Sequence, residues 1–543
     1  MTAERSFYIT TPIYYVNDAP HVGHAYTTLA CDVLARFMRL DGYRVKFLTG
    51  TDEHGQKVEK AAAAAGIAPQ AFTDKVSQNF RDLAKALNIS NDDFIRTTEE
   101  RHVIASQAIW QAIAARKSPK GRENIYLGKY AGWYAVRDEA FYGENELTTG
   151  ADGKKRAPSG AEVEWVEEPS YFFRLSDWQE WLLDYYKSAN PSFIGPASRR
   201  NEVISFVEQG LEDLSISRTT FMWGIPVPGD SAHIMYVWLD ALTNYVTAVG
   251  YPDTKSDEFT TFWPADLHMV GKDILRFHAV YWPAFLKAAD LAPPKRVFAH
   301  GWWTVEGQKM SKSLGNVIDP HALAVKYGLD PVRYFLLREV PFGQDGDFSH
   351  RALVRRLNSD LANDLGNLAQ RVLSFIAKNA GGVIPEPATF INEDNNLRDG
   401  AGQRLYVSVK RELVNLTPGD QPAQHLDVGY PAFHRALEAI WATVGEANLY
   451  VDAQAPWKLR KEDPARMNTV LYVLAETLRC LALLIHPFMP DSMDKLLDQL
   501  AVPKDVRRFD LLGEKGRLVP GTKLPKPEGI FPRYLEADGE AAS

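Results

Sequence analysis

Cysteine is scarce in this chain: its 543 residues include only Cys31 and Cys480. This excludes a disulfide framework and any zinc site built on paired CxxC motifs. Also missing are a run of about 18 apolar residues, which a membrane span requires, and a basic segment followed by an apolar one at the N-terminus. The longest apolar candidate, Leu471 to Pro490, is interrupted by charged side chains and predicts a buried or amphipathic helix. We therefore expect a cytoplasmic protein that does not contact a membrane.

An excess of positive charge is missing as well, since 61 Lys and Arg face 69 Asp and Glu, giving a net charge of −8. That balance argues against a protein that coats nucleic acid, which requires many phosphate-facing cations, but it permits a local RNA-binding face. Hydrophobic residues at 45% and charged residues at 24% exclude disordered, collagen-like and coiled-coil chains. At about 100–200 residues per domain, the length predicts three or four structural units.

Strands and helices alternate at the start of the chain. A β-prone run at residues 7–10 is followed by a helical pattern over about 24–40 and by a second β-prone run at 45–49. This spacing is typical of a βαβ unit in a parallel sheet. Helical patterns then fill residues 56–115.

The later chain divides into three further parts. Gly, aromatic and acidic residues dominate from about 118 to 216, which indicates an insertion with a small sheet of its own. The α/β pattern resumes near residue 232. From residue 351 onward the pattern is helical, and a leucine stripe on one helix face predicts the core of a bundle. The stripe consists of Leu353, Leu357, Leu361, Leu365 and Leu368.

The loop after the first predicted strand contains His21-Val22-Gly23-His24, at the start of the first helix. The N–H groups and partial positive charge of a helix N-terminus at the end of a parallel strand favour a phosphate. Gly23 would let the ligand approach the backbone, and His21 and His24 would donate hydrogen bonds to phosphate oxygens. Two surface histidines flanking a turn explain these four residues equally well.

A second candidate for phosphate contacts is Lys309-Met310-Ser311-Lys312-Ser313. Two lysines on a short loop suit a clamp on a polyphosphate whose charge shifts during a reaction, although most Lys–Ser runs are solvated surface loops. Each motif follows a predicted strand of the α/β part, and their joint occurrence argues against coincidence.

The two motifs resemble HIGH and KMSKS, the signatures of class I aminoacyl-tRNA synthetases, with valine in place of isoleucine in the first. Further segments are similar to the methionyl-tRNA synthetases in particular, so that the resemblance extends over nearly the whole chain. These segments are residues 11–17, 20–26, 50–55, 237–241, 271–274, 452–457 and 530–533.

The resemblance implies an α/β, Rossmann-type catalytic domain with an inserted small α+β connective domain, followed by an all-α anticodon-binding bundle. The implied activity is methionine–tRNA ligation, in which methionine is activated by ATP with Mg2+ and transferred to initiator and elongator tRNA(Met), releasing AMP and pyrophosphate. The expected bounds are 1–117 and 217–318 for the catalytic halves, 118–216 for the insertion, 319–350 for a stem-contact linker, 351–520 for the bundle and 521–543 for an extended tail.

A methionine pocket needs an apolar, aromatic slot for the thioether and a carboxylate for the ammonium group. Asp52, in the turn after the second predicted strand, is placed to supply the carboxylate, although such aspartates more often cap helices or face solvent. Trp238, Ala241 and Tyr245 share a helix face, a pattern that core packing alone also explains. By resemblance, the pocket is lined by Tyr15, Trp238, Ala241, Leu242, Tyr245, Ile274 and His278, with Ile13 contributing its backbone.

Positioning and charge stabilisation by the two histidines and two lysines of the motifs are expected to drive catalysis. Of these, Lys312 is expected to carry the largest share. His300 is expected near ATP but is equally consistent with a core histidine at a strand end. Asp273 is expected at the ribose hydroxyls, or alternatively as a helix cap. The expected ATP-binding residues are His21, Gly23, His24, Asp273, His300, Lys309 and Lys312.

Asn367, Arg371 and Trp457 match anticodon-reading positions of the family, and single-stranded RNA is read by aromatic stacking and by amide and guanidinium hydrogen bonds. From the residues alone, Trp457 after Pro456 is more simply interpreted as a buried core tryptophan. Because the inserted domain contains no cysteine, we expect no zinc, unlike in relatives with zinc knuckles. The chain has no appended oligonucleotide-binding domain, so we expect a monomer.

Three alternatives remain open. Another class I synthetase, such as the cysteine enzyme, would need zinc-binding cysteines at its pocket. A non-catalytic tRNA-binding relative would have no physical need for both intact motifs and Asp52. A different nucleotidyltransferase on the same fold would not need the helical domain that carries Trp457.

Overall fold

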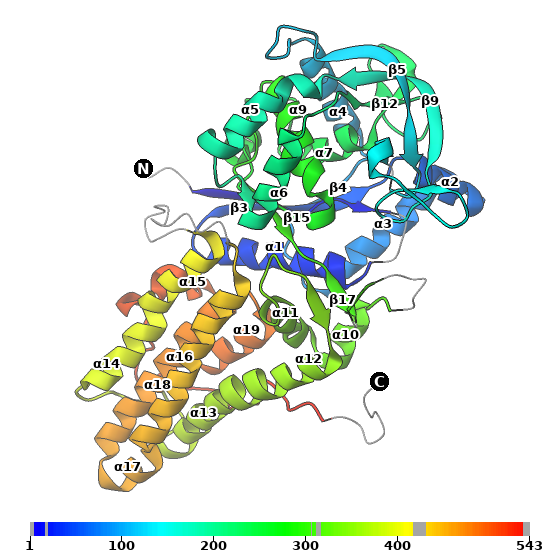
Figure 1. The fold of residues 1–543 in the computed structure, drawn as a ribbon. Coiled ribbons are helices and arrows are strands. Elements are labelled where there is room, and N and C mark those ends of the chain that lie inside the picture. Colours follow the sequence, from blue (N-terminus) through cyan, green and yellow to red (C-terminus); the bar gives the residue numbers. More distant parts are fainter. Residues whose placement is uncertain are drawn as a thin grey trace. The chain divides into compact units, whose positions relative to one another are not determined.

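The chain forms two compact units in the computed structural model, which describes residues 5–16, 20–138, 140–305, 307–310, 316–415 and 430–535. The sheet unit consists of Ser6–Pro20 and Val45–Ala299, and the helical unit consists of Met1–Arg5, His21–Arg44 and His300–Ser543. Helix α1 (Val22–Leu40) therefore belongs to the unit that contains the C-terminal helices, despite its early place in the sequence (Figure 1).

A seven-stranded sheet organises the sheet unit, in the order β10–β16–β15–β1–β3–β2, with β4 paired to β3. The pairing is parallel: Ile9 lies opposite Leu267, and Tyr15 lies opposite Asp52. The predicted Rossmann-type parallel sheet is thus confirmed. The strands are β1 (Ser6–Thr10), β2 (Tyr14–Tyr15), β3 (Arg44–Asp52), β4 (Asp93–Arg96), β10 (Ile194–Gly195), β15 (Leu267–Gly271) and β16 (Val297–His300).

Three helices of the sheet unit, α4, α7 and α9, pack against one another over one face of the sheet (Figure 1). The stretch expected to be wholly helical contains β4 as well, and its pairing depends on a glycine. A Cβ on Gly50 of β3 would lie 2.1 Å from the carbonyl oxygen of Ile95 in β4. The helices are α2 (Gln56–Ala64), α3 (Pro69–Ala86), α4 (Glu100–Ala114), α5 (Gln179–Asp184), α6 (Ala197–Glu208), α7 (Val237–Thr247), α8 (Asp257–Phe262) and α9 (Trp282–Ala288).

The insertion has the small sheet that its composition predicts. The long hairpin of β5 (Ile125–Ala135) and β9 (Glu164–Phe173) is antiparallel and is flanked by β11 (Leu214–Ser215) and β6 (Ala140–Tyr142). The insertion is not self-contained, however, because its β10 pairs with β16 of the main sheet.

The segment near residue 232 departs from the prediction. It forms β14 (Asp230–Met235), which pairs antiparallel with β12 (Ser217–Arg218) and β13 (Pro226–Val227) instead of extending the parallel sheet. These short strands are defined by their tertiary neighbours, so local sequence cannot assign them to a sheet.

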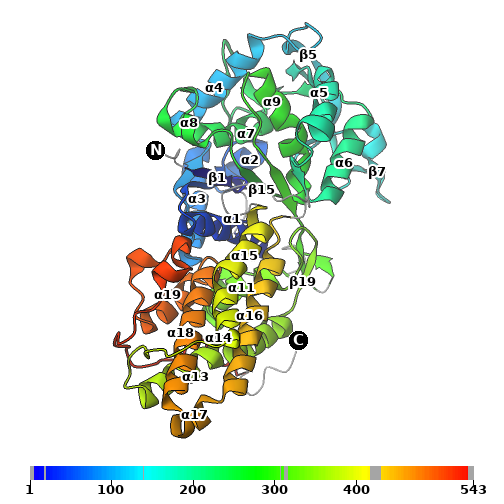
Figure 2. The same ribbon diagram turned by 90° about the vertical axis from the view of Figure 1, so that its left-hand side faces the viewer.

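The helical unit contains the predicted bundle, and all five leucines of the stripe are buried. α12 continues into α13 through a wider, π-type segment, Leu357–Gly366. Figures 1 and 2 both show α16 and α18 side by side. The helices after α1 are α10 (Pro320–Tyr327), α11 (Leu329–Arg338), α12 (His350–Arg356), α13 (Asn367–Asn379), α14 (Asn392–Asp399), α15 (Leu405–Val414), α16 (Phe433–Gln454), α17 (Pro456–Glu462), α18 (Pro464–Ile485) and α19 (Pro490–Gln499).

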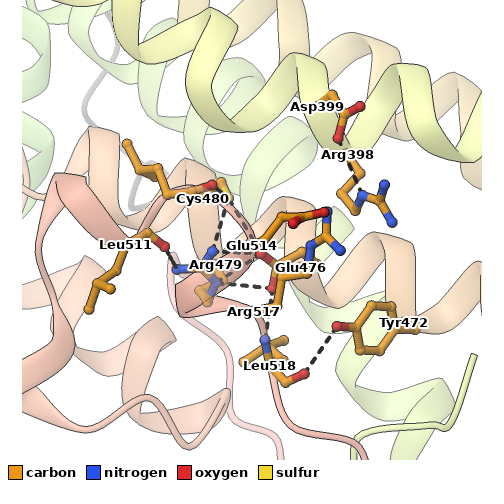
Figure 3. Close-up of polar contacts among 11 residues, drawn as sticks. Arg398, Asp399, Tyr472, Glu476, Arg479, Cys480, Leu511, Glu514, Arg517 and Leu518 are labelled. Atoms are coloured by element: carbon orange, nitrogen blue, oxygen red, sulfur yellow. Dashed lines mark hydrogen bonds and ion pairs between the residues drawn. The ribbon is translucent and has the colours of Figure 1, made fainter. Parts of the chain in front are cut away.

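Helix α18 is long and apolar enough to cross a membrane by length and composition, but 94% of its apolar window is buried inside the protein. It is the core helix of the bundle, as the buried alternative predicts. It also holds an internal ion pair, Glu476 with Arg479, at 2.6 Å (Figure 3). Leu518 N–H donates to the same carboxylate, and the Arg479 guanidinium donates to Leu511 O, which fastens the following chain to α18.

Candidate active site

Asp52 and Tyr15 lie together at the carboxyl end of the parallel sheet. Asp52 ends β3, Tyr15 ends β2, and Val16 N–H donates to Asp52 O over 3.2 Å. Asp52 is only 8% exposed, and the residue that caps α2 is Gly55, so the interpretation of Asp52 as a helix cap or solvent-facing turn is wrong. Ile13, just before β2, packs against the core of this unit. Ligands of open α/β sheets bind at this edge.

The pocket helix α7 carries Trp238, Ala241, Leu242 and Tyr245 at helical spacing on one side. The last three are buried, whereas Trp238 is partly exposed at the border of the core. Ile274 packs against the same core. The structure therefore brings these residues of α7 and Ile274 into one apolar region of the sheet unit.

His278 and Tyr245 form a neutral hydrogen-bonded pair beside this region. The His278 Nδ1–H donates to Ile274 O over 2.9 Å, and the Tyr245 hydroxyl donates to Nε2 over 2.7 Å. A carbonyl oxygen only accepts, which fixes the proton on Nδ1. Burial lowers the pKa of His278 to about 4, so the ring is uncharged at neutral pH. An uncharged imidazole suits a thioether slot.

A second imidazole, His268 of β15, stacks on the Tyr245 ring with centroids 4.0 Å apart. The Trp282 indole N–H donates to His268 Nε2 over 3.3 Å, and Nδ1 lies 2.8 Å from Thr10 Oγ1. Burial and neighbouring His278 lower the pKa of His268. Sequence reasoning missed His268, although a histidine inside an apolar strand is a usable signal of a polar contact.

Phe277 was also missed, and it stacks on Trp238 with ring centroids 3.7 Å apart. The aromatic run that surrounds His278 was its available signal. Asp273 lies on an exposed turn, Lys272–Ile274, just after β15, where Gly271 is the cap residue. Asp273 is therefore not the helix cap, and its carboxylate stands at the same carboxyl edge of the sheet.

In the helical unit, His21 and His24 close the first turn of α1 by reciprocal capping. Gly23 N–H donates to His21 Nδ1 over 3.0 Å, and His21 N–H donates to His24 Nδ1 over 3.1 Å. With Nδ1 accepting in both rings, the proton of each neutral imidazole is on Nε2. The ring centroids are 4.0 Å apart, and burial together with His21 lowers the pKa of His24.

Gly23 is required by its own motif. A Cβ at this position would lie 2.8 Å from Cε1 of His21, closer than nonbonded carbon atoms approach. The glycine thus lets the His21 ring fold back over the helix start, in addition to the ligand approach that the sequence suggests.

Residues on both sides of the KMSKS motif reach α1. Val22 N–H, an end group of the helix, donates to Ile318 O over 3.1 Å. His300, at the end of β16, is 5% exposed; its Nδ1–H donates to Gly301 O, and its Nε2 accepts from the Thr27 hydroxyl over 2.7 Å. It is thus a buried histidine at a strand end that braces α1.

The KMSKS motif itself is described only in part. The backbone of Lys309 ends β18 (Gln308–Lys309), opposite Thr304 of β17 (Trp303–Val305). Lys312 lies outside the described residues. The structure thus places the start of the motif without placing its second lysine.

The three expected anticodon-reading residues lie on two helices of the bundle. Asn367 and Arg371 are one turn apart on α13, and Trp457 is on α17. The Arg371 guanidinium lies 5.8 Å from the Trp457 ring centroid and pairs with Asp452 at 2.7 Å. Trp457 is 44% exposed, so its interpretation as a buried core residue is wrong. An exposed indole beside a guanidinium is suited to base stacking.

Within the described ranges, no group of three or more His, Cys, Asp and Glu side chains is arranged to hold a metal ion. The cysteines are buried in the helical unit, and burial raises the pKa of Cys480 to about 12, so this thiol stays protonated.

Two families match this chain. The family described as tRNA synthetases class I (M) matches residues 7–373, and the one described as anticodon binding domain of methionyl tRNA ligase matches residues 424–542. The first match covers the sheet-unit residues described above, and the second covers helices α16 to α19 of the bundle.

Similar proteins match over nearly their whole length. The methionine–tRNA ligases of Brucella suis biovar 1 and Mesorhizobium japonicum are 58% and 56% identical, over 99% of this chain and 99% and 100% of theirs. The Mycobacterium tuberculosis methionyl-tRNA synthetase in complex with methionyl-adenylate aligns with a TM-score of 0.90 and 53% identity, over 97% of this chain and 100% of that one. The apo form of that synthetase aligns with a TM-score of 0.85 and 49% identity, over 98% and 99%.

Proposed function

This chain belongs to the methionyl-tRNA synthetase family of class I ligases, and from this premise we propose how its residues divide the work of methionine activation and tRNA charging. In the first step a carboxylate oxygen of methionine attacks the α-phosphorus of ATP, and the bond to pyrophosphate breaks. In the second step a ribose hydroxyl of the terminal adenosine of tRNA attacks the methionyl carbonyl carbon, and AMP leaves.

Methionine binds in the sheet unit, and the observation that carries this assignment is the neutral Tyr245–His278 pair at the apolar region of α7. Asp52 receives the ammonium group at the strand ends, where it is partly desolvated and therefore attracts a cation strongly. The uncharged pair accommodates the thioether, which a charged imidazole would disfavour. The remaining pocket residues are Ile13, Tyr15, Trp238, Ala241, Leu242 and Ile274.

ATP binds where the N-terminus of α1 presents Nε2–H donors. The capping bonds hold both Nδ1 atoms as acceptors, so the ring proton of His21 and of His24 is on Nε2, and these N–H groups are the proposed donors to phosphate oxygens. Lys309 and Lys312 add the positive charge that the leaving pyrophosphate requires. Mg2+ arrives with ATP and neutralises part of that charge. Gly23 and Asp273 are further proposed ATP-binding residues, and we propose that His300 acts through α1, because both of its ring nitrogens already have partners.

The bundle reads the anticodon of tRNA(Met), initiator and elongator, through Asn367, Arg371 and Trp457. Support comes from the exposed indole and its guanidinium neighbour on α17 and α13. We further infer a monomeric, cytoplasmic, zinc-free enzyme. Sedimentation that showed a tight dimer, or metal analysis that showed stoichiometric zinc, would contradict these assignments.

ATP–pyrophosphate exchange with each of the twenty amino acids tests the proposed function. Methionine alone is expected to stimulate exchange. Stimulation by another amino acid would favour a sibling synthetase, and stimulation by none would favour a non-catalytic tRNA-binding relative.

The variant Lys312→Ala tests the role of the second lysine. It is expected to slow methionyl-adenylate formation by roughly 100-fold, as loss of a transition-state charge contact does, with little change in the Kd for methionine. The exposed Lys378 on α13 gives a matched control, since Lys378→Ala removes the same charge away from the motif. Near-wild-type exchange in Lys312→Ala would remove the assignment.

A further inference from the structure

Asp240 is a buried carboxylate on α7 that the function proposed above does not use. It is 0% exposed and points away from the pocket side of the helix. Each of its oxygens meets an imidazole: Oδ2 lies 2.6 Å from Nδ1 of His54, and Oδ1 lies 2.7 Å from Nε2 of His102. His54 lies two residues after the end of β3, and His102 is on α4, so one carboxylate of α7 contacts both of these segments.

The His102 side of this network anchors Asp240 to its surroundings. His102 Nδ1 lies 3.2 Å from Thr247 Oγ1, which is also on α7, and Ser106 of α4 contacts the same ring. Figure 1 shows α4 and α7 packed together. The hydrogen bond from Oδ1 to His102 therefore fixes the Asp240 carboxylate relative to α4 and α7. Oδ2, which contacts His54, is fixed relative to the same two helices.

The His54 side of the network holds the segment that carries Asp52. The Glu53 carboxylate accepts two hydrogen bonds from Arg96. The backbone carbonyl oxygen of Glu53 accepts from the Trp223 indole N–H over 2.6 Å, and Gly55 N–H donates to Trp223 O over 3.0 Å. These contacts tie the segment to β4 and to the loop around Trp223. The bond from His54 to Asp240 ties it to the pocket helix.

The strength of this tie follows from charge and burial. Burial alone would favour the protonated acid, but His54 and His102 lower the pKa of Asp240 to about 2. The group is therefore a carboxylate at neutral pH, and hydrogen bonds to a buried carboxylate are short and strong. A strong, directed contact between the Asp52 segment and α7 fixes the separation of the two.

We propose that Asp240 is a positioning residue that, through His54, sets the distance between Asp52 and the pocket side of α7, and so selects the length of the amino-acid side chain. The ammonium group is held at Asp52 and the thioether at α7, so their separation measures the side chain between them. This proposal rests on the function proposed above, in which Asp52 binds the ammonium group.

Replacing the carboxylate by an amide tests the proposal. In Asp240→Asn the side chain keeps its shape but presents NH2 to one imidazole. The KM for methionine in ATP–pyrophosphate exchange is expected to rise at least about tenfold, because a small displacement of a positioning group has a large effect, while the KM for ATP is unchanged. The preference for methionine over S-methylcysteine, one methylene shorter, is expected to fall. An unchanged KM and an unchanged preference would overturn the proposal.

A partly buried carboxylate elsewhere in the sheet unit provides the control. Asp266 accepts from Tyr8 N–H over 2.7 Å and pairs with Lys295, next to the start of β15 and therefore at the opposite end of the strand from the pocket. Asp266→Asn makes the same chemical change and is expected to lower stability without raising the KM for methionine. A matching rise in KM in this variant would show that general destabilisation causes the effect.

The route through Asp52 is tested by combining variants. If Asp240 acts by placing Asp52, then Asp240→Asn adds less than about twofold to the KM of Asp52→Asn, because contacts in one network are not additive. If instead the increases in KM of the two single variants multiply in the double variant, Asp240 does not act through Asp52. If the wild-type protein shows no methionine-dependent ATP–pyrophosphate exchange, the proposed function is wrong. If Asp52→Asn keeps the wild-type KM for methionine, Asp52 does not bind the ammonium group. These two failures can therefore be told apart from a failure of the Asp240 proposal.

Variants of His54 keep the test decisive if Asp240→Asn does not fold. His54→Asn retains a donor near Nδ1 and is expected to keep the KM for methionine within about threefold of wild type, whereas His54→Leu is expected to raise it at least about tenfold. Equal KM values in the two His54 variants would contradict the proposal, because only one of them keeps the hydrogen bond.

Discussion

Two sets of buried carboxylates in this protein differ in their partners, which are guanidinium groups in one set and imidazoles in the other. In the helical unit Glu476 meets Arg479 and Asp32 meets Arg333, each at 2.6 Å. In the sheet unit Asp240 meets two imidazoles. A guanidinium keeps its charge at every accessible pH, whereas an imidazole titrates near neutrality and can be held neutral by burial.

The two kinds of partner occur in different surroundings. The Glu476–Arg479 ion pair lies within α18, and the Asp32–Arg333 pair fastens α1, with its HVGH motif, to α11. Near the proposed thioether slot, neutral rings such as His278 and His268 supply directed hydrogen bonds without a formal charge. The residues around the proposed thioether slot are therefore held by hydrogen bonds between neutral groups, which suit an apolar ligand.

The largest expected effect comes from breaking an arginine pair. In Arg479→Met the buried Glu476 carboxylate loses its cation, which is expected to lower the free energy of unfolding of the helical unit by about 3–5 kcal/mol. Denaturant unfolding followed by circular dichroism measures this change. The pair is drawn in Figure 3 beside its matched control, Arg517, whose partner Glu514 is largely exposed.

The control variant Arg517→Met is expected to cost less than about 1 kcal/mol, because exposed pairs contribute little. The double variant Arg479→Met, Glu476→Gln is expected to recover part of the loss, since it removes the orphaned charge as well. Equal losses in Arg479→Met and Arg517→Met would show that the buried pair is not the anchor of this region.

The histidines of the sheet unit predict an acid sensitivity that the arginine pairs do not share. Burial lowers the pKa of His278 to about 4, so between about pH 6.5 and pH 4 the folded ring stays neutral while the unfolded one takes up a proton. Stability therefore falls as the pH falls through this window, by about 3 kcal/mol in total, and is fully present above it.

The variant His278→Gln is expected to remove this part of the pH dependence, measured as unfolding free energy at steps from pH 7 to pH 4. The exposed His321 on α10 serves as control, because His321→Gln should leave the slope as in wild type. An unchanged slope in His278→Gln would mean that another group causes the acid sensitivity.

Local sequence pattern was sufficient for the frame of the molecule. The spacing of apolar and turn-forming residues predicted β1, α1 and β3, and the leucine stripe from Leu353 to Leu368 predicted a buried bundle face. Both predictions depend only on residues that are close in sequence. The position of HVGH at the first turn of α1 followed from the same pattern, and reciprocal capping by His21 and His24 gives it a geometric basis.

Contacts between residues that are far apart in the chain could not be predicted from local sequence pattern. Strands β4, β10 and β14 are short, and their sheet partners depend on tertiary packing rather than on propensity. The bond between His54 and Asp240 spans 186 residues, so no spacing rule reveals it. The exposure of Trp457 is likewise decided by where α17 ends the bundle, which a single aromatic residue after a proline does not encode.

The smallest expected effect comes from a neutral hydrogen bond of the pocket. Tyr245→Phe removes the hydroxyl that donates to His278 Nε2 and keeps the ring that stacks on His268. Because both partners are uncharged, we expect a loss of about 1 kcal/mol in unfolding free energy, well below the cost of breaking an arginine pair. Denaturant unfolding of the sheet unit measures the stability change, and exchange kinetics measure a modest rise in the KM for methionine. A loss of unfolding free energy above about 3 kcal/mol would mean that the Tyr245–His278 pair carries charge. The contrast between the ion pairs of the helical unit and the neutral hydrogen bonds of the pocket would then no longer hold.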